Sequence, residues 1–163
     1  MANIIEVSDK LKSLIAEKGD IKAQYSVALT QTREITMENG EFTLFRTLFD
    51  NDVEIKVIKD GKVGTTSLNK FDDKALSDAV DNVLVSAEAG TADENFDIAP
   101  GMDEAKFTIG AVEPDIDKLM QRAKELSEDI KNRHPKVLVM QIILKHVSTH
   151  SIYRNTNGSR DEK

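Results

Sequence analysis

The sequence predicts an α+β (α/β) fold, an antiparallel or mixed β-sheet with about three helices packed against it, and suggests an internal α/β duplication. Apolar residues recur at helical spacing in separate segments of the 163-residue chain. Other segments alternate apolar and polar residues, as half-buried strands do. Asn-Gly and Asp-Gly dipeptides between these alternating segments are strong signals for tight hairpin turns.

The first predicted element is a helix near the N-terminus. Gly19 follows it as a stop signal. One face of this helix carries its apolar residues, which are Ile4, Val7, Leu11, Leu14 and Ile15.

A long strand is predicted over residues 23–37, where apolar side chains occupy odd positions. Asn39-Gly40 then turns the chain into a second strand. A two-residue turn sets the register, which opposes Glu38 to Glu41, Met37 to Phe42 and Ile35 to Leu44.

Two further turns complete a predicted meander of about four antiparallel strands over residues 22–68. The first is expected at residues 50–52, an Asp-Asn-Asp sequence. The second is Asp60-Gly61, which opposes Lys59 to Lys62.

Helices are predicted after the meander. Asp73 is a suitable N-cap for a helix over residues 74–89. A connecting loop follows over residues 91–107. Pro114 suits the first turn of another helix, which His134-Pro135 closes.

The last predicted elements are one or two strands over residues 137–155. Asn157-Gly158 signals another hairpin turn, but only five polar residues follow it. The sequence therefore raises the question of where the returning strand lies.

The composition excludes several classes of function. A net charge of -7 argues against unaided binding of nucleic acid or anionic membranes. The absence of cysteine excludes disulfides, thiolate metal sites and a cysteine nucleophile. No signal peptide or membrane span is predicted, and we expect a cytoplasmic protein.

Candidate catalytic and metal-binding residues are few. His146 and His150 have the spacing of a zinc-binding helix, but the segment is predicted to be a strand, which holds them about 13 Å apart. His134 is interpreted as a helix-end residue. Residues 61–66 fit a hairpin better than a phosphate loop. We therefore predict no catalytic residue and no metal ligand.

A family resemblance goes further than these patterns. The hairpin V-x-K-D-G-K-x-G over residues 57–64 is followed by T-x-x-L and by a helix of D-x-x-x-L-x-x-A-V type. The tail over residues 153–158 is a strand followed by an Asn-Gly turn. This arrangement resembles the N-terminal domain of the family labelled modulators of DNA gyrase, the paired TldD/PmbA-type zinc metallopeptidases.

The resemblance implies a single N-terminal domain over residues 1–163, part of a longer chain. The family's zinc-binding motif has no counterpart here, so this chain is expected to hold no cofactor, and zinc would belong to the remainder of the parent protein. The resemblance also implies a homo- or heterodimer that acts on extended peptides. The strand after Asn157-Gly158 would then lie in the remainder of the protein.

An absent return strand would leave an open backbone edge beside the last predicted strand. An open edge can pair with an extended peptide or a partner chain. The residues predicted for this edge are Ile152, Tyr153, Arg154, Asn155, Asn157 and Gly158.

Three interpretations of function stay open. The first is a non-catalytic domain that shapes the cavity of a peptidase dimer. The second is a module that modulates DNA gyrase by binding the protein without proteolysis, as the family label implies. The third is a stand-alone structural domain.

Overall fold

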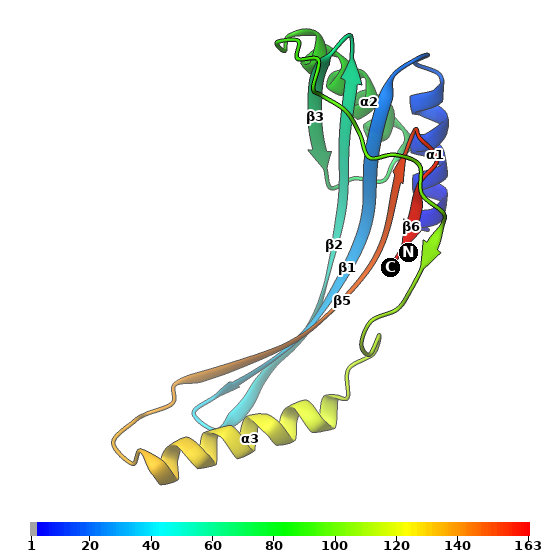
Figure 1. Cartoon of the computed structure of the whole chain (residues 1–163). Coiled ribbons are helices and arrows are strands. Elements are labelled where there is room, and N and C mark those ends of the chain that lie inside the picture. The colour runs from blue at the N-terminus through cyan, green and yellow to red at the C-terminus, as the bar shows by residue number, and fades with distance from the viewer. Residues whose placement is uncertain (1–2) are drawn as a thin grey trace. The chain divides into compact units, whose positions relative to one another are not determined.

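The computed structural model describes residues 3–163, which form three helices and six strands (Figure 1). The sheet has the order β3-β2-β1-β5-β6-β4, with antiparallel pairs and one parallel pair, β4 with β6. The predicted α+β class with a mixed sheet is therefore confirmed. The helices are α1 (Ile4–Ala16), α2 (Asp73–Glu88) and α3 (Ile116–Arg133). The strands are β1 (Lys22–Glu38), β2 (Glu41–Lys59), β3 (Lys62–Leu68), β4 (Ala105–Lys106), β5 (Gln141–Asn155) and β6 (Arg160–Glu162).

Both predicted dipeptide turns between β1, β2 and β3 are confirmed. Asn39 and Gly40 have φ values of 49° and 89°, and Asp60 and Gly61 have 52° and 70°. Positive φ at both central residues is the conformation that Asn-Gly and Asp-Gly adopt most readily. The β2–β3 register pairs Lys59 with Lys62, as the turn predicted.

The predicted turn at residues 50–52 is wrong, because β2 continues through it without interruption. Asp50 and Asp52 are exposed, and none of the three residues has positive φ. Polar residues on an exposed strand segment need no turn, since their side chains remain in water. The meander therefore has three strands instead of four.

Side-chain caps fix the starts of α2 and α3. The carboxylate of Asp72 accepts a hydrogen bond from the Ala75 amide at 2.9 Å, so the N-cap lies one residue before the predicted Asp73. In α3 the N-cap is Asp115, and Pro114 precedes it instead of lying in the first turn. His134 ends α3, as predicted.

The chain divides into two compact units, each built from separate segments. The first unit comprises the chain up to Leu29, Asp50–Ile109 and Thr149–Lys163. The second comprises Thr30–Phe49 and Gly110–Ser148. Because each unit is discontinuous in sequence, neither corresponds to one half of a tandem α/β duplication.

The core of the first unit lies between α1, α2 and one face of the strands. Both helices contribute apolar stripes, and odd-numbered residues of β1 and β2 meet them. Such a core is expected, because the apolar residues of each helix lie on one face and alternate residues of each strand lie on one face of the sheet. The strand residues of this core are Ala23, Tyr25, Val27, Val53, Ile55, Val57 and Ile152.

In the second unit, α3 is found with parts of β1, β2 and β5. Lys124 of α3 lies 5.7 Å from the ring centroid of Phe42. The buried Glu34 carboxylate pairs with Arg46 at 2.8 Å and Lys145 at 3.1 Å, so strands on either side of β1 supply its cations. The hydrogen bond from Lys145 is the main reason that the pKa of Glu34 is lowered. None of the helices in the described chain combines the length and hydropathy that a membrane span requires.

Candidate functional site

A groove of about 500 Å³ lies on the sheet of the first unit, across β1, β2, β3 and β5. Its side chains are mainly hydroxyl, amide and charged groups. They include one acid and one base, so the groove has no strong preference for charge. The lining residues are Gln24, Tyr25, Ser26, Glu54, Ile55, Lys56, Thr65, Thr66, Ser67 and Tyr153.

The groove is polar because the strands alternate. Tyr25 and Ile55 belong to the core against α1 and α2. Their neighbours Ser26 and Glu54 point to the opposite face of the sheet, since successive strand residues face opposite ways. The groove therefore occupies the face of the first unit that carries no helix.

Strand β3 ends the sheet beside this groove. It follows β2 in the sheet order, and within residues 3–163 no strand pairs with its other side. Because Lys59 and Lys62 flank a two-residue turn, that pair exchanges hydrogen bonds, and every second residue does so after it. The intervening Thr65 and Ser67 therefore direct their N–H and C=O groups away from β2.

The last residue of α2 and the segment that follows this helix contact the turn end of β3. The Asp93 amide donates to the Gly61 carbonyl at 2.9 Å, and the Lys62 ammonium donates to the Glu88 carbonyl at 2.9 Å. These contacts lie at the turn end of β3. The opposite end, at exposed Thr65 and Ser67, is the accessible part of the edge.

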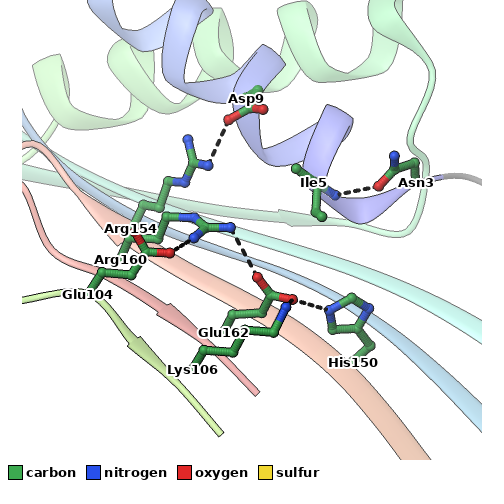
Figure 2. Close-up of polar contacts among 9 residues, drawn as sticks. All are labelled: Asn3, Ile5, Asp9, Glu104, Lys106, His150, Arg154, Arg160 and Glu162. Atoms are coloured by element: carbon green, nitrogen blue, oxygen red, sulfur yellow. Dashed lines mark hydrogen bonds and ion pairs between the residues drawn. The ribbon is translucent and has the colours of Figure 1, made fainter.

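A tyrosine and an arginine are buried beneath the groove. Burial raises the pKa of Tyr25 to about 12, although the nearby Arg154 acts in the opposite direction. Arg154 is itself buried, and its Nη2 lies 2.7 Å from Asp9 Oδ1 of α1 (Figure 2). The ion pair between Arg154 and Asp9 links β5 to α1. Burial keeps the Tyr25 phenol neutral.

Two cations, Lys106 and Arg160, and the imidazole of His150 surround the buried carboxylate of Glu162 in β6 (Figure 2). Its oxygens lie 2.8 Å from Lys106 Nζ, 3.0 Å from Arg160 Nη2 and 3.2 Å from His150 Nε2. The hydrogen bond from Lys106 is the main reason that the pKa of Glu162 is lowered, and His150 adds to it, whereas burial opposes it. Arg160 also pairs with Glu104.

The Glu162 cluster is better suited to holding the fold than to catalysis. A carboxylate neutralised by neighbouring cations is a weak base, and general-base catalysis needs a pKa near the working pH. Lys106 lies in β4, His150 in β5 and Glu162 in β6, so the cluster joins three adjacent strands.

The return strand after Asn157-Gly158 is present, so its predicted absence is wrong. Strand β6 pairs antiparallel with β5, and Tyr153 lies opposite Asp161. Ser151 and Lys163 exchange backbone hydrogen bonds of 2.9 and 3.0 Å. A fully polar strand is stable here because its charged side chains find partners, notably in the Glu162 cluster.

The predicted edge residues of β5 are consequently not an open edge. Ile152 is fully buried in the core. Arg154 is paired with Asp9, as described above. Tyr153 lines the groove, on the sheet face instead of the sheet edge.

The remaining predicted edge residues hold the turn and a neighbouring loop. Asn155 Oδ1 accepts from the Ser159 amide at 2.9 Å. The side-chain amides of Asn155 and Asn157 both donate to the Ala99 carbonyl, at 3.1 and 2.8 Å. Gly158 has a φ of 101°, which supports the turn. Peptide binding by these residues stays a prediction.

The histidines occupy the elements predicted for them. His146 and His150 lie in β5, and His146 Nε2 is 2.9 Å from the Ala111 carbonyl oxygen. Within residues 3–163, no group of three His, Cys, Asp or Glu side chains could hold a metal ion. The residues present therefore do not fit the zinc site of a metallopeptidase.

Sequence reasoning missed the Glu162 cluster and most of the groove. Lys106 and Glu162 are far apart in the chain, and no motif connects them. The groove residues are ordinary polar members of alternating strands. No sequence signal marks these residues, because it is the pairing of the strands that brings them together.

Comparisons with known proteins identify the fold. The structure is similar to a protein from Thermotoga maritima labelled a modulator of a DNA gyrase, with a TM-score of 0.71 and 21% identity over 99% of this chain. It is similar to TldE from Thermococcus kodakarensis, with a TM-score of 0.73 and 14% identity over 96% of this chain. A protein from Bacteroides thetaiotaomicron, also labelled a modulator of DNA gyrase, has a TM-score of 0.76 and 12% identity over 97% of this chain.

These similarities cover only part of the solved structures. The chain spans 37% of the first two and 38% of the third. No curated protein matches the chain. Residues 27–87 match the family model described as PmbA/TldA metallopeptidase domain 1. This match over residues 27–87 and the shared fold confirm the predicted resemblance to the N-terminal domain of the PmbA/TldD metallopeptidase family.

Proposed function

We propose that this chain is a non-catalytic domain of a metallopeptidase-type protein, that it contributes to the cavity of a dimer, and that it binds extended peptides. The observation that carries the proposal is the polar groove beside the accessible end of β3. The whole protein would hold its zinc with residues outside this chain, and it would act in the cytoplasm.

The β3 edge offers main-chain recognition. A peptide laid antiparallel or parallel to β3 would bond to the outward N–H and C=O groups of Thr65 and Ser67. Strand addition of this kind derives affinity from main-chain hydrogen bonds and little from side-chain identity. The groove would also accept peptides of different sequence, because an acidic side chain of the peptide would find Lys56 and a basic one would find Glu54.

The test replaces one outward donor without disturbing the sheet. Thr65→Pro removes the amide that points away from β2, and proline is tolerated on edge strands. Thr65→Ala is the matched control, because it removes the side chain and keeps the amide. The probe is a fluorescein-labelled, capped decapeptide of serine, threonine and valine, measured by fluorescence anisotropy.

We expect Thr65→Pro to weaken binding about tenfold relative to Thr65→Ala, which is the free energy of roughly one hydrogen bond. A second peptide, in which every other backbone amide is N-methylated and so cannot donate a hydrogen bond, should bind neither the Thr65→Pro variant nor the Thr65→Ala variant. Equal affinities of the two variants, or equal affinities of the two peptides, would contradict strand addition at β3.

The second candidate function is binding of DNA gyrase, because two of the similar structures carry that label. It predicts that purified gyrase binds the chain with the same affinity whether position 65 is threonine, alanine or proline. The two functions are therefore distinguished by the same set of variants.

A further inference from the structure

A second cavity lies in the first unit, on the α1 side of the sheet. It has a volume of about 240 Å³ and is formed where the end of α1 meets the turn between β5 and β6. Its lining residues lie within residues 12–25 and 155–158, and all of them belong to the first unit. Among the described residues, only Tyr25 lines both this cavity and the polar groove.

The walls of this cavity are mainly aliphatic. Ile15 and Ala16 come from the last turn of α1, and Ile21 precedes β1. Gly19 and Gly158 also line the cavity, and a Cβ atom added at either would have no heavy atom within 4 Å beyond its chain neighbours. The two glycines therefore leave open space between the end of α1 and the β5–β6 turn. An aliphatic chain suits this space, because burying apolar surface is favourable.

The charged groups of the cavity favour an anionic ligand. The lining contains one cation, Lys12, and no carboxylate. Lys12 is exposed on α1, and within residues 3–163 its ammonium has no hydrogen bond or ion pair. An anion in the cavity would therefore find an unpaired cation, whereas a cation would find no partner of opposite charge.

Two hydroxyl groups of the lining can add hydrogen bonds to an anion. The Thr156 hydroxyl accepts from the Ala23 amide at 3.0 Å, which leaves its own proton free to donate. The Tyr25 phenol is neutral, so it also carries a proton. The Asn155 side chain is already engaged with Ala99 and Ser159, as described above.

We propose that this cavity binds a small aliphatic monocarboxylate, with the carboxylate on Lys12 and the chain against Ile15, Ala16 and Ile21. A mainly apolar cavity with a few polar groups is the usual composition of a small-molecule site. At about 30 Å³ for each water-sized atom, the cavity holds roughly eight non-hydrogen atoms, which matches an acid of about five or six carbons. The site does not depend on peptide binding at β3.

The first experiment titrates the 163-residue chain with sodium pentanoate at constant ionic strength, followed by the backbone amide NMR signals. The amides of Gly19 and Gly158 should shift and saturate. Each methylene added between propanoate and pentanoate should tighten binding about fourfold, because the added group is buried. Pentylamine has the same chain with the opposite charge, and it should bind at least roughly tenfold more weakly than pentanoate.

The second experiment tests the charge on α1. Lys12→Gln should weaken pentanoate binding about fivefold, the value of a partly exposed ion pair, and should leave 1-pentanol binding unchanged. Lys12→Arg should restore most of the affinity for pentanoate, because it restores the charge. Lys10→Gln is the matched control: it removes the same charge from the same helix, but Lys10 pairs with Asp73 and does not line the cavity.

The third experiment fills the cavity. Ala16→Leu adds three carbons to its wall and should weaken pentanoate binding at least roughly tenfold, because these carbons occupy the space of the ligand chain. Ala16 is exposed on α1, and leucine is a good helix former, so the chain should still fold. Ser13→Leu is the matched control at an exposed position of α1 that does not line the cavity.

Three results would overturn the proposal. The first is that pentanoate causes no saturable shift of the Gly19 and Gly158 amides. The second is that pentanoate and pentylamine bind equally well, and the third is that Lys12→Gln binds pentanoate as tightly as Lys10→Gln. Thr65→Pro should bind pentanoate as the wild type does, so failure of this proposal and failure of peptide binding at β3 are distinguishable.

Discussion

Gly64 of β3 lies in contact with the backbone of α2 at Val83. A Cβ atom at Gly64 would stand 2.1 Å from the Val83 carbonyl oxygen and 2.7 Å from the Ala87 amide nitrogen. Real Cβ atoms do not approach other atoms so closely, and helix backbone cannot move aside as a flexible side chain can. The glycine therefore sets how closely α2 packs on the sheet.

Gly64→Ala should lower the free energy of unfolding by about 3 kcal/mol, the upper end of the usual cost of overpacking a core. Gly90→Ala is the comparison, since its nearest atoms would be 3.2 Å away and its cost should be much smaller. Chemical denaturation of the two variants and the wild type measures the difference. Equal stabilities of the two variants would show that α2 shifts freely.

Gly101→Ala should release the loop before β4 from the β5–β6 turn. The added Cβ would lie 2.2 Å from the Asn157 carbonyl oxygen, a backbone atom. The expected result is faster limited proteolysis within residues 91–104, with little loss of global stability, because the loop lies mostly outside the core. Met102→Ala, at a 63% exposed side chain, should leave the cleavage rate unchanged.

The Glu162 carboxylate should make stability fall at acidic pH. Its pKa in the folded chain is below its ordinary value of 4.5, chiefly because Lys106 donates to it. The stabilisation is therefore fully present above pH 4.5 and is lost as the pH falls through the folded-state pKa.

Glu162→Gln should remove this part of the pH dependence and cost about 1–2 kcal/mol at neutral pH. The cost is lower than the roughly 3–5 kcal/mol of a fully buried pair, because the cations around Glu162 remain partly in water. Glu128→Gln, at an exposed position of α3, is the control. If the free energies of unfolding of Glu162→Gln and the wild type fall in parallel as the pH is lowered, the acid-induced loss of stability does not come from Glu162.

The Tyr25 phenol should make stability fall at alkaline pH. Burial raises its pKa from 10.0 to about 12, so the folded chain favours the neutral form. The resulting stabilisation is complete below pH 10.0 and is lost as the pH rises through about 12.

Tyr25→Phe should abolish this alkaline decline, whereas Tyr153→Phe should retain it. Denaturant unfolding between about pH 9 and 12, followed by circular dichroism, measures both variants against the wild type. The same decline in Tyr25→Phe as in the wild type would assign the effect to another group. Tyrosinate absorbance of Tyr153→Phe, in which Tyr25 is the remaining tyrosine, provides an independent titration of the buried phenol.

The sequence alone determined the elements whose signals are local. The turns at Asn39-Gly40 and Asp60-Gly61 require positive φ at both central residues, a conformation that few residue types other than Asn, Asp and Gly tolerate. The two dipeptides were therefore enough to predict where the chain turns. The stripe of α1 and the alternation of β1 predicted buried faces because periodicity depends only on neighbouring residues. The same local rules failed at residues 50–52, where polar residues lie on an exposed strand.

Only the tertiary structure decided which distant groups meet. The returning strand β6 has no apolar residue to announce it, and it is held by pairing with β5 and by partners that include Lys106. The groove exists because β1, β2, β3 and β5 lie in an order that the chain sequence does not state. Strand order and long-range ion pairs depend on the free energy of the whole packed sheet, whereas turns and periodicity depend on a few adjacent residues.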